Sequence, residues 1–474
     1  MPDRGKRIAG LIVAGLRGGA GKTVVSLGIA RAWTQGNYHV SVFKKGPDYI
    51  DAGWLSQAAG RPCYNLDTFM CHPSTVQNSF FRHSAGSDIA VVEGNRGLYD
   101  GLDYQGSTST AELAKLLGLP VLLVVDCTKS TRTIAALVMG CSCFDPDVRI
   151  CGVVLNYLAG NRHENIIRKS IETSCQIPVL GAIPRFSEKD FPERHMGLVT
   201  ADEHSSPDHS IDLAADIVNQ YLDLPRLYNS CIPGKTTLSP PVPQADDPWD
   251  SQNSIDCQDK VRIGILHDSA FSFYYQENLN ALEANGAELL FISPLDHRFI
   301  PQVHALYIGG GFPETHASRL SENQTFRQQL KALSRKGLPI YAECGGLIFL
   351  GKELVLDQKI YPMTDIFPIT FGLAKKPQGC GYTIARVVND TPFYQKGDIV
   401  KGHEFRYSTV LHMDYTQKDM GFQMEKGTGI IDHKDGFSID NTFGTYTHVH
   451  ALGTPQWASS LTARARAYKH SHQN

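Results

Sequence analysis

Residues 17–23, RGGAGKT, constrain the fold of this chain more than any other part of its sequence. They follow an apolar stretch with strand character that ends near Ala14, and they lead into a helical stretch that begins at Lys22. Glycines let successive backbone amides turn toward phosphate oxygens, and a helix N-terminus adds partial positive charge. A strand, a glycine-rich loop and a helix in this order predict a phosphate-binding loop in an α/β domain.

The same segment predicts how a nucleotide is held. Lys22 is expected to reach the β- and γ-phosphates of ATP, and the Thr23 hydroxyl is expected to ligate Mg²⁺. The loop departs from the strict GxxxxGK(S/T) pattern, because Leu16 stands five residues before Gly21, and it is closer to loops with a basic residue ahead of two glycines. A glycine-rich turn with a chance Lys-Thr pair is the alternative. The predicted ATP-binding residues of the loop are Gly18, Gly19, Gly21, Lys22 and Thr23.

Strand-like runs alternate with helical stretches in two parts of the chain. The runs of the first part are 8–13, 40–43, 88–92, 121–125 and 150–155, and those of the second part are 261–266, 287–292, 305–308 and 339–342. A stretch rich in Pro, Ser, Asp and Gln separates the two parts. We therefore predict an α/β fold of two domains, 1–221 and 261–474, joined by a linker at 222–260. The first domain should hold a mostly parallel sheet with helices on both faces.

Composition and charge exclude several classes of protein. Lys and Arg number 45 against 48 Asp and Glu, so no strongly basic surface favours nucleic acid as a partner. The longest apolar runs, such as 119–125, are far shorter than the roughly 20 residues that cross a bilayer. Residues 1–7 lead into a strand without the small-residue cleavage site of a signal peptide. The 11 cysteines show no paired CxxC spacing. We expect a soluble, cytoplasmic protein that binds neither membrane nor nucleic acid.

Two acidic residues follow predicted strands of the first domain. Asp48 comes shortly after the strand at 40–43, and Glu93 comes directly after the strand at 88–92. Open α/β sheets bind ligands at the carboxyl ends of their strands, and phosphate-bound Mg²⁺ is completed by one or two protein oxygens. We therefore predict that Asp48 and Glu93 join Thr23 at a magnesium site, each with a second acid nearby, Asp51 and Asp100. Solvated loop carboxylates are the alternative.

A cysteine of the second domain lies in a nucleophile-elbow pattern. Residues 337–347 read as a strand, a tight turn of small residues around Cys344 and the start of an apolar helix. A thiol at a helix start is biased toward thiolate, and the amide of Gly345 can form an oxyanion hole with those of Gly310 and Gly311 in an upstream turn. His448, in a late segment, is the predicted base. A structural cysteine and histidine are the alternative.

Together these motifs closely resemble one family, the cobyrinic acid a,c-diamide synthases, which are glutamine-dependent amidotransferases of tetrapyrrole biosynthesis. The resemblance covers nearly the whole chain and includes the phosphate loop, Lys44 with 46–51, 93–101, 106–117, 155–156, 193–195, 270–275, 309–314, 342–346, 402–405 and 446–448. It implies an N-terminal synthetase domain similar to dethiobiotin synthetase and a C-terminal class I, triad-type glutaminase domain.

The resemblance implies an ATP- and glutamine-dependent ligase. Cys344 would attack the side-chain amide of glutamine and release ammonia, with His448 as the proton carrier. MgATP would phosphorylate a substrate carboxylate, and ammonia would then displace the phosphate. The implied substrate is a tetrapyrrole of the cobyrinic acid type, amidated on its a and c acetate side chains. The implied site residues of the first domain are Thr23, Asp48 and Glu93 toward magnesium, Tyr49, Asp51, Arg96 and Asp100 around the carboxylate, and Asn156 near adenine.

The sequence departs from the family pattern at two places. Full Cys-His-Glu glutaminases carry Glu two residues after the histidine, where this chain has His450, so we expect a dyad whose histidine is oriented by another group. Arg96 and the residue before it stand where the family more often has apolar residues. Arg96 is expected to clamp further substrate carboxylates, or else to pair with Asp100 or Asp103 and stiffen its loop. For Asn156, a turn residue that ends a strand is the alternative.

Other functions stay open. A same-class alternative is amidation of sirohydrochlorin or siroheme, and the sequence does not distinguish the macrocycles, their metal or the number and order of amidations. The phosphate loop also resembles that of switch ATPases that partition cargo or bind membranes, but those commonly need an amphipathic helix, and the tail at 459–474 is polar. A regulatory module with an inactive glutaminase is disfavoured by Cys344 and His448. The expected partners are ATP, L-glutamine and the tetrapyrrole, with a homodimer left open.

Overall fold

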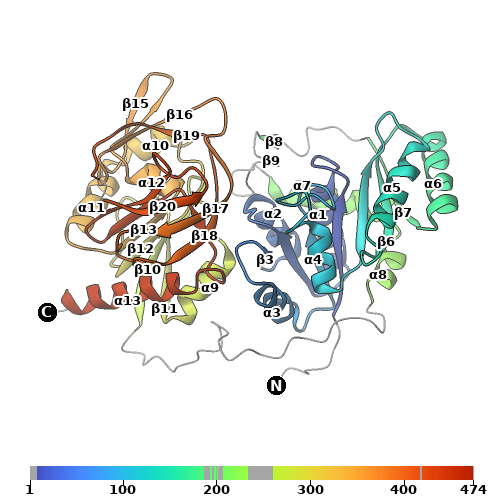
Figure 1. The fold of residues 1–474 in the computed structure, drawn as a ribbon, viewed down its shortest axis with the longest axis horizontal. Helices are drawn as coiled ribbons and strands as arrows, with labels where there is room; N and C mark the ends of the chain where they lie inside the picture. The colour runs from blue at the N-terminus through green and yellow to red at the C-terminus, as the bar shows by residue number, and fades with distance from the viewer. Residues whose placement is uncertain are drawn as a thin grey trace. The chain divides into compact units, whose positions relative to one another are not determined.

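The chain forms two compact units, Met1–Pro243 and Gln244–Asn474 (Figure 1). The structure is a computed structural model, and it describes residues 8–185, 193–194, 197–198, 200, 206–232, 260–416 and 419–472. Residues 233–259, which make up most of the predicted linker, and residue 195 of the resembling segments lie outside the described residues. Both units are α/β structures, as the sequence predicts, and each is described by itself.

A seven-stranded parallel sheet in the order β3-β2-β4-β1-β5-β6-β7 forms the centre of the first unit. Its strands are β1 (Ala9–Gly15), β2 (Val40–Lys45), β3 (Cys63–Leu66), β4 (Ile89–Glu93), β5 (Val121–Asp126), β6 (Ile150–Leu158) and β7 (Val179–Pro184). Its helices are α1 (Lys22–Gln35), α2 (Ile50–Ala59), α3 (Pro73–Ser84), α4 (Thr110–Leu117), α5 (Thr133–Phe144), α6 (Asn161–Cys175), α7 (Pro207–Tyr221) and α8 (Leu224–Cys231). Two short strands, β8 (Glu193–Arg194) and β9 (Gly197–Leu198), pair antiparallel.

Helices cover both faces of this sheet because side chains alternate along each strand. Val42 and Val91 share one buried cluster with α1, α2, α7 and α8, whereas Phe43 points the other way and packs on Phe80 of α3 at 5.0 Å between ring centroids. The sheet is therefore a buried layer whose strand ends are left for ligands.

Helix α8 differs from the prediction, since it lies in the first part of the stretch predicted as linker. Asp223 caps it by accepting the Arg226 amide at 3.0 Å, and Leu227 and Cys231 are buried in the cluster of α1 and α7. Proline at the first turn of a helix is well tolerated, so the proline of this stretch starts a helix here instead of ending structure.

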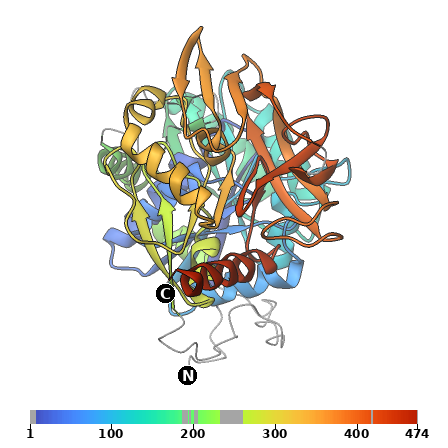
Figure 2. The ribbon, with the colours of Figure 1, turned by 90° about the vertical axis from the view of Figure 1, so that its left-hand side faces the viewer.

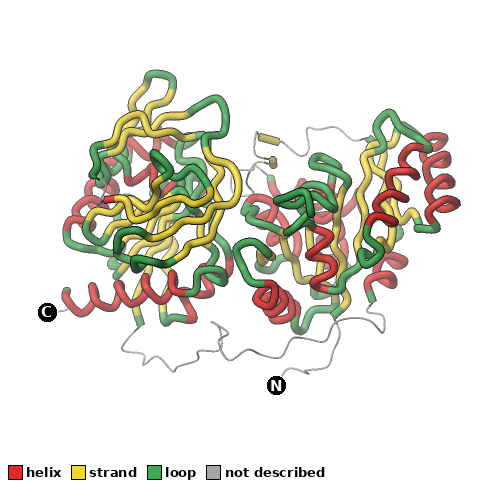
Figure 3. The backbone as a smooth tube through the Cα atoms, viewed as in Figure 1, coloured by secondary structure: helices red, strands yellow, loops and turns green. Residues whose placement is uncertain are grey.

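The second unit holds a ten-stranded mixed sheet, β11-β10-β12-β13-β22-β21-β20-β17-β18-β23, and a four-stranded sheet, β15-β14-β16-β19 (Figure 3). The strands are β10 (Val261–Leu266), β11 (Ala287–Ile292), β12 (Ala305–Ile308), β13 (Ile340–Glu343), β14 (Glu353–Leu356), β15 (Lys359–Pro362), β16 (Ile369–Leu373), β17 (Gly379–Val387), β18 (Ile399–Arg406), β19 (Ser408–Met413), β20 (Met420–Lys426), β21 (Lys434–Ile439), β22 (Thr442–Thr445) and β23 (His448–Val449). The helices are α9 (Gln276–Ala284), α10 (Ala317–Glu322), α11 (Gln324–Arg335), α12 (Gly345–Leu350) and α13 (Gln456–Ser471).

The parallel part of this sheet, from β11 to β22, also carries a helical layer on each face. Ile340 of β13 lies in the cluster that contains α11 and α12, whereas Tyr341 lies in the cluster that contains α9 and α13. Trp457 and Leu461 anchor α13, the red helix of Figure 2, in that second cluster. None of the helices in the described ranges has the length and apolar character needed to cross a bilayer.

Candidate functional site

The phosphate loop of the first unit has the predicted setting between β1 and α1. Gly19 and Gly21 have φ angles of 71° and 89°, a left-handed conformation that favours glycine. A Cβ atom on Gly21 would lie 2.2 Å from Nδ2 of Asn156, so this turn also needs a residue without a side chain. Nζ of Lys22 donates to the backbone oxygen of Arg17 at 3.1 Å, which curls the lysine over the loop.

Asn156, in β6, holds the phosphate loop from the side. Its Nδ2 donates to the backbone oxygen of Ala20 at 3.0 Å, and its Oδ1 accepts the amide of Tyr157 at 2.9 Å. The side chain is buried and braces the loop through this contact. Its predicted contact with adenine stays a prediction.

Lys44 gathers the predicted carboxylates at the carboxyl end of β2. Its Nζ lies 2.5 Å from Oδ2 of Asp51, 2.9 Å from Oε1 of Glu93 and 3.7 Å from Oδ2 of Asp48. The Thr23 hydroxyl donates to the same Glu93 oxygen at 2.8 Å. Lys44 and Glu93 are buried. The structure thus brings four predicted residues together around the ammonium of Lys44, which was not itself a predicted site residue.

The segment between β2 and α2 fixes where these carboxylates lie. Oδ1 of Asp48 accepts the Asp51 amide at 3.0 Å, and Nδ2 of Asn65 donates to the backbone oxygens of Gly46 and Asp48 at 2.8 and 3.0 Å. Tyr49 is the residue directly before α2. One hydrogen-bonded turn therefore carries Asp48, Tyr49 and Asp51 together.

Three carboxylates around one ammonium leave this cluster with surplus negative charge. Burial raises the pKa of Glu93 and of Asp48, since the charged forms lose water. Burial acts in the same direction on Asp51, but Lys44 outweighs it and lowers the pKa of Asp51. Burial opposes the charge of Lys44 as well, yet Asp51 and Glu93 raise its pKa well above the usual value. A further cation would stabilise the ionised forms of Glu93 and Asp48.

Thr23 and Glu93 fit a Mg²⁺ ion carried on ATP. Oε2 of Glu93 is buried and has no hydrogen-bond partner among the described residues, and the Thr23 hydroxyl lies beside the other oxygen of the same carboxylate. A phosphate-bound magnesium needs only one or two protein oxygens, because phosphates and water supply the rest. In the described ranges no group of three or more His, Cys, Asp or Glu is placed to enclose an ion without such help.

The loop after β4 carries Arg96 and Asp100. Arg96 is exposed and has a φ angle of 53°, which is uncommon for a residue with a side chain. Oδ2 of Asp100 accepts the amide of Gly97 at 2.9 Å, and Oδ2 of Asp103 accepts the hydroxyl of Ser107 at 2.5 Å. Neither carboxylate forms an ion pair with Arg96 in the part of the chain that the structure describes.

Cys344 lies in a strained turn between β13 and α12. Its φ and ψ angles are 47° and −97°, which only a tightly supported residue retains, and a nucleophile elbow has such strain. Its amide donates to the backbone oxygen of Thr445 at 2.8 Å, at the end of β22. A Cβ atom on Gly346 would lie 2.5 Å from the backbone oxygen of Ile308, so the turn after the cysteine requires glycine.

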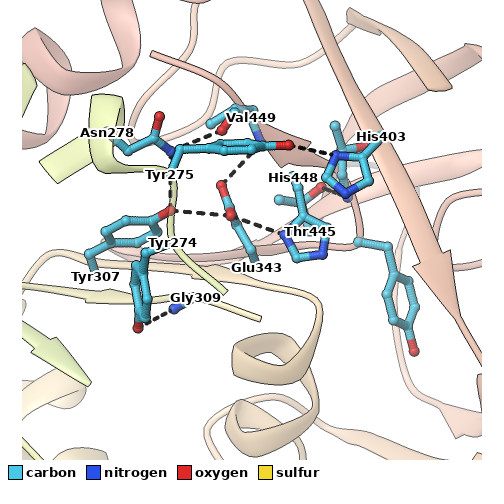
Figure 4. Close-up of polar contacts among 12 residues, drawn as sticks. Tyr274, Tyr275, Asn278, Tyr307, Gly309, Glu343, His403, Thr445, His448 and Val449 are labelled. Atoms are coloured by element: carbon cyan, nitrogen blue, oxygen red, sulfur yellow. Dashed lines mark hydrogen bonds and ion pairs between the residues drawn. The ribbon is translucent and has the colours of Figure 1, made fainter. Parts of the chain in front are cut away.

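His448 lies beside Glu343 (Figure 4), and its ring also contacts Cys344. Its Nδ1 is 3.2 Å from Oε2 of Glu343, and the thiol of Cys344 hydrogen-bonds the same ring. Burial alone would lower the pKa of His448, but these two hydrogen bonds raise it to about 10. The acid that orients the histidine is thus the residue directly before the nucleophile. The sequence predicts a dyad whose histidine is oriented by another group, and in the structure Glu343 contacts the ring in this way.

Glu343 is held in turn by a buried network. The hydroxyl of Tyr307 donates to its Oε2 and the amide of Val449 donates to its Oε1, both at 3.2 Å (Figure 4). Nδ2 of Asn278 donates to the Tyr307 hydroxyl at 3.3 Å and to the backbone oxygen of Val449 at 2.9 Å. The sequence signal for Glu343 was a charged residue at the end of an apolar strand, on the same strand face as Tyr341.

One buried carboxylate fixes the segment that precedes His448. Asp435 accepts the hydroxyls of Thr445 and Thr447 at 2.7 and 3.0 Å, and the amides of Tyr446 and Thr447 at 3.0 and 3.1 Å. Because the Cys344 amide bonds the backbone oxygen of Thr445, this segment joins the nucleophile to the base. Asp435 was not among the predicted site residues, because it lies ten residues or more from these partners and no local motif contains both.

The predicted oxyanion-hole glycines lie beside Cys344 and His448. A Cβ atom on Gly310 would lie 2.5 Å from Cε1 of His448, and one on Gly345 would lie 3.0 Å from the Gly311 amide nitrogen. The turn after β12 therefore meets the start of α12 next to the thiol. Amides in this place suit an oxyanion that forms when the thiolate adds to a carbonyl.

His450 belongs to a different part of the core. Its Nε2 lies 3.7 Å from Oε1 of Glu277, and its ring packs on Tyr275 at 4.8 Å between centroids. His403 stacks on His448 at 4.9 Å, and burial together with the charge of His448 lowers the pKa of His403 well below its usual value. This arrangement favours His448 over His450 as the histidine beside the nucleophile.

Comparisons with known proteins match both units. A family model described as a CobQ/CobB/MinD/ParA nucleotide binding domain matches residues 11–199, and a model described as a CobB/CobQ-like glutamine amidotransferase domain matches residues 262–456.

Curated relatives match nearly the whole chain. A protein of Magnetococcus marinus named cobyrinate a,c-diamide synthase is 41% identical over 96% of this chain and 97% of its own. Proteins with the same name from Archaeoglobus fulgidus and Methanobrevibacter smithii are 36% and 37% identical, over 97% and 96% of this chain and 98% and 99% of their own.

Replacing Glu343 with Gln should lower kcat for glutamine hydrolysis by about 10²- to 10⁴-fold, with a smaller change in KM. An amide cannot stabilise the imidazolium and permits the wrong tautomer of His448. Steady-state glutaminase assays measure this loss. Glu353→Gln is the matched control. It changes a carboxylate of β14 that accepts the hydroxyl of Thr370, and it should behave as wild type. A Glu343→Gln protein with the kcat of wild type would show that the contact has no catalytic role.

The raised pKa of His448 also predicts how stability varies with pH. Its ordinary value is 6.5 and its value in the folded chain is about 10, so the folded state binds the proton more tightly. The stabilisation is complete below about pH 6.5 and is lost as the pH rises toward 10. The difference in Tm between wild type and His448→Gln should therefore shrink across this window. A difference that stays constant from pH 6.5 to 10 would contradict the assignment of the charge.

Proposed function

The chain belongs to the cobyrinate a,c-diamide synthase family, and from that membership we propose that it amidates the a and c acetate carboxylates of a cobyrinic-acid-type tetrapyrrole, with ATP and glutamine as co-substrates. It is a ligase with a nucleotide-binding domain and a glutamine amidotransferase domain. The observation that carries the proposal is that one chain holds two groups of residues: a phosphate loop beside buried carboxylates, and a Cys-His-Glu array beside a glycine turn.

The second unit would supply ammonia. Sγ of Cys344 attacks the side-chain carbonyl carbon of glutamine, and the amides of Gly310, Gly311 and Gly345 stabilise the oxyanion. The carbon–nitrogen bond breaks as His448 gives its proton to the leaving ammonia, which leaves a γ-glutamyl thioester. Water, deprotonated by His448, then attacks the thioester and releases glutamate and the thiol. Glu343 keeps the His448 ring in the orientation that both proton transfers need.

The first unit would activate the substrate carboxylate, because oxide is too poor a leaving group for direct attack by ammonia. A carboxylate oxygen attacks the γ-phosphorus of ATP, ADP leaves, and a carboxyl phosphate results. Ammonia then adds to its carbon, phosphate leaves, and a proton is lost to give the amide. Mg²⁺, when bound, neutralises charge on the β- and γ-phosphates. The residues proposed to hold it are Thr23, Asp48 and Glu93.

The remaining residues of the first unit divide between the nucleotide and the carboxylate. Lys22, at the end of the phosphate loop, is proposed to stabilise the negative charge on the phosphoryl group during its transfer. Gly18, Gly19 and Gly21 are proposed to present amides to the phosphates, and Asn156 to contact adenine. Tyr49, Asp51 and Asp100 are proposed to surround the reacting carboxylate, and Arg96 is proposed to contact further carboxylates of the same substrate. The segments of all four residues follow β2 and β4 at one end of the sheet.

Amidation of sirohydrochlorin or siroheme is the second candidate function, since the same chemistry serves any acetate-bearing tetrapyrrole. Incubation with MgATP, glutamine and each macrocycle separately, followed by mass spectrometry, decides between them. Each amidation replaces a hydroxyl by an amino group, so the product masses count the amides formed. We expect two amides on cobyrinic acid, and no amide on any macrocycle would overturn the proposed function.

Replacing Cys344 with Ala should abolish amidation driven by glutamine and leave amidation driven by high concentrations of ammonia. Only ammonia release depends on the thiol, whereas carboxylate activation takes place in the first unit. Product formation with each nitrogen source measures the split. Cys380→Ala, which changes an exposed cysteine of the same unit, is the control and should keep both activities. Glutamine hydrolysis by Cys344→Ala would contradict the assignment of the nucleophile.

Replacing Lys22 with Ala or Glu93 with Gln should remove amidation with either nitrogen source, because both residues are proposed to act on the phosphoryl transfer from MgATP. We expect losses of about 10²-fold or more, as for other removed groups that stabilise charge in a transition state. Glu172→Gln, at an exposed position of α6, is the control. Normal ammonia-dependent amidation by either variant would refute the proposed nucleotide site.

A further inference from the structure

Strand β2 ends in two consecutive lysines whose side chains point to opposite faces of the sheet. Lys44 shares its face with Val42 and reaches the carboxylates described above. Lys45 shares the other face with Phe43, which packs on α3. Lys44 is paired with Glu93 in the register of β2 and β4, so Lys45 comes level with the beginning of the loop that follows β4.

Lys45 is buried without a counter-ion. Its exposure is 7%, and no carboxylate in the described ranges forms an ion pair with it. The acid with the strongest effect on it, Asp67, accepts the amides of Phe69 and Met70 at 2.8 and 2.9 Å. Burial lowers the pKa of Lys45 to about 8, and the opposing effects of Asp67 and Asp100 offset this lowering only in part. A buried ammonium without an ion pair lowers the stability of the folded chain. A lysine at this position is therefore better explained by binding of an anionic ligand than by a contribution to stability.

Arg96 is a second cation in the same place. It comes three residues after Glu93, which pairs with Lys44 in the register of β2 and β4, and its charge is close enough to lower the pKa of Lys45. Its guanidinium has no ion pair with any described carboxylate, because Asp100 and Asp103 are bound by groups of their own loop. Its φ angle of 53° is a strained conformation, of the kind that is often retained for function.

We propose that Lys45 and Arg96 form a binding site for a second carboxylate of the substrate, one that is not being amidated while it is held there. The proposal rests on the function proposed above and adds to it the recognition of a substrate with more than one anion. A substrate amidated at both its a and c acetates carries at least two carboxylates, so one stays anionic while the other reacts.

Charge balance explains why such a carboxylate needs its own cations. Asp48, Asp51 and Glu93 already exceed the charge of Lys44 on the other face of β2, and ATP adds more negative charge. A second substrate carboxylate near this end of the sheet would therefore be repelled unless cations faced it. Arg96 can bind it through two parallel N–H groups, and the Lys45 ammonium can serve as a point charge that becomes paired on binding.

The test compares Lys45→Met, Arg96→Met and the double variant with wild type in the full-length protein. The measured quantities are the apparent KM for cobyrinic acid at saturating MgATP and ammonia, the KM for MgATP, and direct binding of cobyrinic acid by fluorescence quenching without ATP. Arg149→Met, at an exposed position before β6 and at the opposite end of the strands, is the control and should leave every quantity unchanged.

We expect each single variant to weaken cobyrinic acid binding by about tenfold or more while the KM for MgATP changes less than about twofold. The double variant should lose less than the product of the two single losses, because both cations hold one carboxylate. Lys45→Met should keep or raise the Tm, since it removes an uncompensated buried charge. Arg96 is exposed, so Arg96→Met folds and can decide the question by itself.

Three results would overturn the proposal. These are an unchanged affinity for cobyrinic acid in both single variants, a loss of MgATP affinity in place of macrocycle affinity, and an equal fall in turnover with unchanged KM, which indicates a loop brace. Failure of the proposed function gives a different result. In that case wild type forms no amide on any macrocycle, with glutamine or ammonia, and binds none of them in the quenching assay.

Discussion

The buried ammonium of Lys44 is the interaction on which the first unit's site depends. Asp51 and Glu93 lie 2.5 and 2.9 Å from it, and its charge opposes the effect of burial on the pKa of each carboxyl group. Breaking such a pair typically costs about 3 to 5 kcal/mol, because a charge is left buried and unpaired. The register of β2 and β4 sets Lys44 beside Glu93, so the parallel sheet itself determines the spacing of the groups that would meet MgATP.

The second unit depends on two buried carboxylates, which hydrogen-bond donors hold in place. Asp435 is fully buried and is satisfied by the hydroxyls and amides of residues 445–447, while Glu343 is satisfied by Tyr307, Val449 and His448. Glu343 therefore orients the ring of His448, and Asp435 holds the segment that leads into His448. Because β13 and β22 pair in parallel, the ends of both strands bring Cys344 and the segment before His448 to the same edge.

Local patterns in the sequence were sufficient to predict the residues whose roles depend on their immediate neighbours. The phosphate loop, Cys344 and His448 stand in short motifs, and the strands around them were placed within a few residues of their observed ends. Lys44, Glu343 and Asp435 were not assigned, because their roles depend on which strand pairs with which and on the face to which each side chain points. The same holds for α8. Its proline can mark either the end of ordered structure or the start of a helix, and here a helix forms because Leu227 packs into the core of the first unit.

The two lysines at the end of β2 differ in role: the charge of one has a structural function, and the charge of the other is available to a ligand. They have the same chemistry and adjacent positions, and they differ in the face of the sheet on which each lies. Lys44 meets carboxylates of its own chain, and its charge is already used to hold them. Lys45 forms no ion pair in the described ranges. The charges that act on it are two acids, Asp67 and Asp100, which bind amides of their own segments, and two cations, Arg96 and Lys44. A buried cation without an ion pair costs the folded chain stability, so a lysine at this position is explained by an anion that arrives with the substrate.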